Sequence, residues 1–191
     1  MEEHDGVYKK WRDLNVANRL AIPFDVVHVD ARADLGMGDS SWHYISTDLL
    51  HRNECDRINP IEGGPNGLNQ GNFLLFAVAC RWIRELTYVY HPDSKIGFGL
   101  RDIPRTAMKN FDVDCQIIQL KKFNSLTPLG IRPEDSVLVG LEPEVPLHKV
   151  AGKDFMASAN FDFMFLTRSP RYTPAIADAL IPVIMQYIAV D

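Results

Sequence analysis

Hydrophobic and polar positions along this chain follow two different periods, and together they predict both helices and strands. Apolar residues recur at helical spacing in three segments. These predicted helices cover residues 5–20, 69–85 and 174–190. Shorter apolar runs predict buried strands over residues 86–90, 115–120, 136–141 and 157–165. A further strand, Phe24 to Asp30, is nearly continuous in apolar side chains, as in a sheet covered on both faces.

The order of these elements predicts the fold class. Strands that alternate with helices indicate an α/β fold with a mainly parallel sheet flanked by helices. A length of 191 residues is typical of one domain, so residues 1–191 are expected to form a single domain. Residues 36–66 are rich in Gly, Asp, Ser, Asn and Pro, which predicts a long connection of the kind that often carries function.

Composition narrows the classes of partner. The formal net charge is -5 and basic residues form no cluster, which argues against nucleic-acid binding. No apolar run approaches the roughly 20 residues of a membrane span, and the polar, acidic first five residues argue against a secretory signal. Cys55, Cys80 and Cys115 have neither metal-finger nor redox-motif spacing, so we expect buried structural thiols in a cytoplasmic protein. No motif specifies an oligomeric state.

Carboxylates at strand ends are the main candidates for chemistry. Asp30 and Asp34 close the first strand, and Asp162 lies in the predicted strand 157–165. In a parallel sheet ligands bind beyond the carboxyl ends of the strands, and paired carboxylates there hold metal ions or cationic substrates. Arg32 stands between the first two, and its guanidinium keeps its charge and has no lone pair to donate.

Several segments together resemble a known family. They are Glu3-His4-Asp5, His28 to Asp34, Gly71 to Leu74 running into Arg81-Trp82-Ile83, Asn160 to Phe163, and Ser169 to Pro174. Over essentially the whole chain these segments resemble the arginase-like family that includes peptide arginases, within the arginase/deacetylase superfamily. The resemblance implies a three-layer arginase-like fold.

The resemblance also implies a metal centre. Enzymes of this type hold two manganese ions. The ligands of one ion correspond to His4, Asp30, Asp34 and Asp162, and that set is complete. The two ligands that belong only to the other ion correspond to Arg32 and Met164. An alternative register pairs Asn160 with Asp162, so that an amide replaces one carboxylate. We therefore expect one manganese ion or none, with Arg32 filling the second pocket.

The chemistry implied by the resemblance is hydrolysis of peptide arginine to ornithine and urea. His43 is the candidate acid or base, and Asp39 and Glu62 are candidates to bind the cationic substrate. Deacetylation is disfavoured, because its single zinc uses the pocket whose ligands are replaced here. One alternative is a weakened or inactive relative that binds a peptide or protein partner through the same cleft. Another is that Arg32 is an engineered change.

Plainer structural roles remain open for the same residues. Asp30 and Asp34 could pair with Arg32 or cap a helix, and Asp162 could pair with an internal arginine. His28 is expected to lie on the face opposite Val27 and Val29 and to act as a core histidine rather than a ligand.

Overall fold

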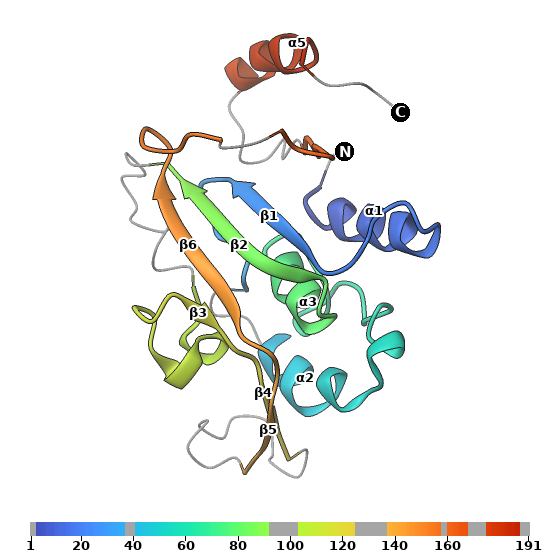
Figure 1. Cartoon of the computed structure of the whole chain (residues 1–191). Helices are drawn as coiled ribbons and strands as arrows, with labels where there is room; N and C mark the ends of the chain where they lie inside the picture. Colours follow the sequence, from blue (N-terminus) through green and yellow to red (C-terminus); the bar gives the residue numbers. More distant parts are fainter. Residues whose placement is uncertain are drawn as a thin grey trace.

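A four-stranded sheet in the order β1-β2-β6-β3 forms the centre of the fold (Figure 1). The computed structural model describes residues 3–36, 41–91, 103–124, 137–157, 160–167 and 175–187. The parallel strands are β1 (Phe24–Val29), β2 (Ile83–Tyr90) and β6 (Val145–Ala151), and β3 (Ile117–Ile118) runs antiparallel to β6. The predicted mixed α/β fold with a mainly parallel sheet is confirmed.

One face of the parallel strands is buried, and the opposite face carries both apolar and polar side chains in the described part of the chain. Val26, Leu86 and Leu147 lie side by side across the three parallel strands, and all are buried. Residues one position along each strand point the other way, where His148 pairs with Glu85 at 3.3 Å in a half-exposed position. The prediction that the first strand is covered on both faces is wrong. β1 is an edge strand, and Val29 at its end is 69% exposed.

The first predicted helix is α1 (Asp5–Val16), which ends four residues earlier than expected. Its apolar positions Val7, Trp11 and Leu14 are buried, as helical spacing predicts. The helix ends where the chain reaches Asn18, whose φ of 55° leaves the right-handed helical region.

The second predicted helix is wrong in its second half. α3 (Phe73–Ala79) ends six residues before the expected end at residue 85, because the chain reverses at Arg81, where φ is 59°. The N–H groups of Arg81 and Trp82 donate back to the carbonyls of Val78 and Ala77, which closes the helix end. β2 then begins at Ile83. An apolar run of this kind does not by itself separate a buried helix from a buried strand.

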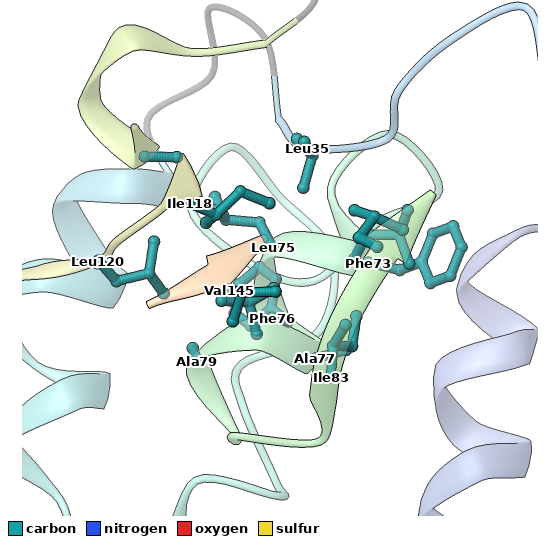
Figure 2. Packing of buried hydrophobic residues seen from close by; sticks show 14 of the residues in the cluster. Leu35, Phe73, Leu75, Phe76, Ala77, Ala79, Ile83, Ile118, Leu120 and Val145 are labelled. Atoms are coloured by element: carbon teal, nitrogen blue, oxygen red, sulfur yellow. The ribbon is translucent and has the colours of Figure 1, made fainter. Parts of the chain in front are cut away.

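Every residue of α3 is buried, so this helix is the centre of the hydrophobic core. Figure 2 shows its side chains packed among residues from the loop after β1, from the segment around β3 and from the start of β6. The residues labelled there outside α3 are Leu35, Ile83, Ile118, Leu120 and Val145.

The predicted long loop is helical in part. Residues 41–56 contain α2 (Ser41–Thr47) and the 3₁₀ turns η1 (Leu49–His51) and η2 (Glu54–Asp56). Tyr44, Ile45, Leu49 and Leu50 bury their side chains in the core and so fix this segment. The prediction of a continuous loop over 36–66 is therefore wrong for this stretch.

The segment between β2 and β6 contains short elements. They are η3 (Arg105–Ala107), η4 (Lys109–Phe111), β3, and the antiparallel pair β4 (Lys121–Phe123) and β5 (Leu138–Leu141). The predicted strand over 115–120 is reduced to two residues. The predicted strand over 136–141 exists as β5, but Leu138 is 50% exposed, so its expected burial is wrong. β4 and β6 have no counterpart among the predicted elements.

The C-terminal predictions differ most from the structure. Residues 160–167 form no strand, and Phe161, Phe163 and Met164 are exposed. Residues 158 and 159 of that predicted strand lie outside the described residues. In place of one closing helix, the chain forms η6 (Ala175–Leu180) and the short α5 (Ile181–Ile184). Tyr187, just after α5, is 81% exposed, so the described part of this end does not seal the core. Residues 174 and 188–190 of the predicted helix lie outside the described residues.

Two predictions from composition can be compared with the structure. The expectation of buried thiols is met by Cys80, but Cys115 is half-buried and Cys55 is exposed. Within the described ranges, no helix has the length and apolar character needed to cross a membrane.

Candidate metal centre

Three of the predicted metal ligands meet at the carboxyl end of β1. His4 directly precedes α1, and its Nδ1 lies 2.8 Å from Asp34 Oδ2 and 3.3 Å from Asp30 Oδ2. One ligand atom from each of these residues lies within 4.8 Å of the other two. We call His4, Asp30 and Asp34 the carboxylate–histidine group. It joins residues that are 30 positions apart in the sequence.

Local structure explains why these side chains converge. Asp30 directly follows β1, and its N–H donates to the carbonyl of Val89 on β2, so the sheet fixes its position. Asp34 lies four residues later in a tight loop and has a φ of 50°, which is uncommon outside glycine. Its carbonyl accepts a hydrogen bond from the N–H of Leu74 at the start of α3. The group therefore rests on β1, α1 and α3 together.

Burial and mutual hydrogen bonding set the charges of the group. Asp34 is 4% exposed, and burial alone would raise the pKa of its carboxyl group. Hydrogen bonds from His28 and His4 outweigh burial and lower that pKa. The hydrogen bond to Asp34 raises the pKa of His4 despite the burial of the imidazole, and the charges of Asp34 and Asp30 act in the same direction.

His28 lies beside this group and packs against core residues, as predicted for a core histidine that is not a ligand. Its Nε2 lies 3.4 Å from Asp34 Oδ2 and 3.0 Å from the carbonyl oxygen of Arg32. The alternation of β1 correctly puts His28 on the same face as Val26, where it contacts Tyr88 and Phe73. The sequence signal for this proximity is the two-residue spacing from His28 to Asp30, which directly follows β1.

The fourth predicted ligand is not in the group. Asp162 is exposed and lies outside any strand, so the expectation of a carboxylate buried in a strand is wrong. Met164, at the position matched to a lost second-metal ligand, is 48% exposed. Arg32 is exposed on the loop, and its backbone N–H donates to Asp30 Oδ1 at 3.2 Å.

The remaining candidates lie elsewhere or outside the described residues. Asp39 is among residues 37–40, which the structure does not describe. Glu62 is half-exposed and pairs with Lys9 of α1 at 3.1 Å. His43 is in α2, and within the described part of the chain its buried Nε2 has no hydrogen-bond partner. Neither Glu62 nor His43 belongs to the carboxylate–histidine group.

The donor set of the group fits a divalent cation. Two carboxylates and one imidazole are ligands that Mn²⁺ and Zn²⁺ accept, and three protein ligands leave positions for water or substrate. The shared hydrogen bond between His4 and Asp34 brings these donors together before any ion binds. The residues present are thus suited to one ion.

In comparisons with known proteins, no family model, curated protein or solved structure matched this chain. The class defined by the fold and site is therefore limited to a mixed α/β protein with a candidate cation site at the carboxyl end of an edge strand.

Proposed function

We propose that this chain is a metal-dependent, arginase-like hydrolase that binds one manganese ion through His4, Asp30 and Asp34. The proposed substrate is the guanidinium group of a peptide arginine, giving ornithine and urea. The supporting observation is the convergence of His4 on two carboxylates from a distant loop, with the 2.8 Å contact to Asp34. When bound, such an ion supplies Lewis acidity at the carboxyl end of β1.

Each residue has a defined part in this proposal. Asp34 supplies a buried anionic ligand, Asp30 supplies a second carboxylate nearer to solvent, and His4 supplies a neutral imidazole nitrogen. Asp162 would join from the C-terminal segment, and His43 would act as acid or base. The proposal includes an arginase-like fold, which the parallel arrangement of β1, β2 and β6 supports.

Arg32 determines how many ions the proposal allows. A guanidinium cannot replace an imidazole as a ligand, so Arg32 would occupy the place of a second ion. The alternative function, a weakened relative that binds a peptide or partner through the same region, rests on this same residue. The two functions differ in whether urea is released.

The test is a manganese titration followed by electron paramagnetic resonance, together with a urea assay on an arginine-containing peptide. We expect one ion per native chain and a loss of affinity of about 100-fold or more in Asp30→Asn. Asp25→Asn is the matched control, because Asp25 is a carboxylate of β1 that pairs with Arg84 away from the group. It should leave manganese binding unchanged.

The outcomes separate the parts of the proposal. Absence of binding by the native chain would overturn the metal site. Two ions bound by the native chain would overturn the role given to Arg32. Urea release by the native chain supports the enzyme, whereas release only by Arg32→His supports the weakened relative.

A further inference from the structure

The loop from Asp30 to Gly36 has a conformation that needs support. Asp34 has a φ of 50° and Gly36 a φ of 78°. Glycine adopts this region without strain, but an aspartate in it is strained, and such residues persist only where their surroundings hold them. The direction of the Asp34 carboxylate depends on this backbone conformation. The contacts that hold the loop therefore decide where the carboxylate lies.

Two of these contacts come from the α3 side of the loop. The N–H of Leu74 donates to the carbonyl of Asp34 at 3.3 Å, and the N–H of Gly36 donates to the carbonyl of Gly71 at 2.9 Å. Both act on the second half of the loop. In the first half of the loop the backbone N–H of Arg32 donates to Asp30 Oδ1, whereas the carbonyl of Arg32 needs a separate anchor.

His28 supplies that anchor from β1. Its Nε2 lies 3.0 Å from the carbonyl oxygen of Arg32. A carbonyl oxygen can only accept, so the proton must be on Nε2. The same nitrogen is 3.4 Å from Asp34 Oδ2, and this donor therefore faces two acceptors of one loop.

The imidazole of His28 is itself held by aromatic neighbours. It stacks on Tyr88 with ring centroids 6.0 Å apart, and it meets Phe73 edge-on at 5.9 Å. Its side chain is 12% exposed. Because Tyr88 belongs to β2 and Phe73 to α3, the ring is fixed by the two elements that also border the loop.

We infer that His28 is a positioning residue, which holds the carbonyl of Arg32 and so keeps Asp34 aimed at His4. Its Nε2 is engaged by the carbonyl of Arg32, so we assign His28 to the loop and not to the ion. The consequence for metal affinity rests on the function proposed above. The effect on the loop is independent of any metal.

The first measurement is amide hydrogen exchange on the metal-free protein. His28→Phe keeps an aromatic ring beside Tyr88 and Phe73 but removes the donor, whereas His28→Gln keeps an N–H donor. We expect the amides of Gly36 and Leu74 to exchange at least about tenfold faster in His28→Phe, with partial recovery in His28→Gln. Amides within β2 and β6 should keep their native rates. Unchanged exchange at Gly36 and Leu74, or equal acceleration throughout the sheet, would overturn the inference.

The second measurement is manganese affinity of the same variants. We expect a loss of about 10- to 100-fold in His28→Phe, the range found when partners of metal ligands are removed, and a smaller loss in His28→Gln. His148→Phe is the matched control, because His148 also pairs with a carboxylate of the sheet but on the face opposite His28. It should bind manganese like the native chain.

The two measurements distinguish this inference from the proposed function. A native chain that binds no manganese overturns the proposed function, and the exchange rates then still decide the role of His28. Faster exchange in His28→Phe with native manganese affinity would contradict the claim that loop position controls the site.

Discussion

Two buried carboxylates in this molecule have opposite surroundings. Glu142 is 3% exposed and Asp34 is 4% exposed. Glu142 contacts three permanent cations: Arg57 at 3.1 Å, Arg81 at 2.8 Å and Lys122 at 3.0 Å. Its charge is therefore neutralised by the protein itself.

Asp34 is held by imidazoles. His4 and His28 are its side-chain partners in the described part of the chain, at 2.8 and 3.4 Å. An imidazole can lose its proton and then bind a metal, which a guanidinium cannot do. A buried carboxylate is thus a candidate for function where a metal ion can replace its partners, and is structural where its partners are fixed cations.

The largest expected effect is at the structural site. Glu142→Gln should destabilise the protein by about 3–5 kcal/mol, because it leaves the buried Arg57 guanidinium without its countercharge. Urea denaturation of the metal-free protein measures this loss. Asp25→Asn, which removes an exposed carboxylate paired with Arg84, should cost less than about 1 kcal/mol. Equal losses of stability in Glu142→Gln and Asp25→Asn would contradict the structural role of Glu142.

Lowering the pH should also reduce the stability that Glu142 contributes to the folded protein. Burial opposes ionisation of Glu142, but hydrogen bonds from Arg57, Arg81 and Lys122 lower its pKa from 4.5 to about 2. A carboxylate with a lowered pKa stabilises the folded state above its unfolded pKa, and this contribution is lost as the pH falls from about 4.5 through 2. The shift corresponds to about 3 kcal/mol. Unfolding free energies of the native chain and Glu142→Gln should therefore converge over this range; a constant difference would contradict the assignment.

Manganese should stabilise the protein only through the carboxylate–histidine group. At a free concentration 100 times the dissociation constant, binding to the folded state adds about 2.7 kcal/mol. For a chain of this size that raises the melting temperature by roughly 5–10 °C. Calorimetry should find the same rise in Glu142→Gln, if it folds, and in Asp25→Asn, but none in Asp34→Asn. A rise in Asp34→Asn would place the ion elsewhere.

The smallest expected effect is on the metal-free stability of Asp34→Asn. The amide oxygen can still accept a hydrogen bond from His4 or His28, and no permanent cation loses its countercharge. We expect a loss of about 1 kcal/mol, the net worth of an ordinary hydrogen bond. A loss as large as that in Glu142→Gln, measured in the same urea series, would make Asp34 a structural residue.

The sequence predicted the part of the site that depends on local spacing. Alternation in β1 puts His28 on the buried face, and the strand end puts Asp30 and Asp34 at the carboxyl edge of the sheet. His4 entered only through family resemblance, since nothing in its local sequence specifies a contact 30 residues away. The anchoring role of His28 depends on the backbone of Arg32, which side-chain patterns do not encode.

The wrong predictions have separate physical causes. Apolar alternation predicts a strand only if another surface covers it, and the segment around Phe161 and Phe163 is exposed without one in the described residues. The apolar run from Phe73 to Ile83 did not reveal the reversal at Arg81, where no glycine marks the left-handed turn. β6 was not predicted, because Pro146 is uncommon within strands and His148 interrupts the apolar run with a polar residue.

The most direct test of the central claim is anomalous diffraction from crystals of the native protein soaked in manganese chloride. We expect one strong anomalous peak per chain, within bonding distance of His4 Nδ1 and of carboxylate oxygens of Asp30 and Asp34. The absence of a peak there, or a stronger peak at another group of residues, would contradict the proposed metal site.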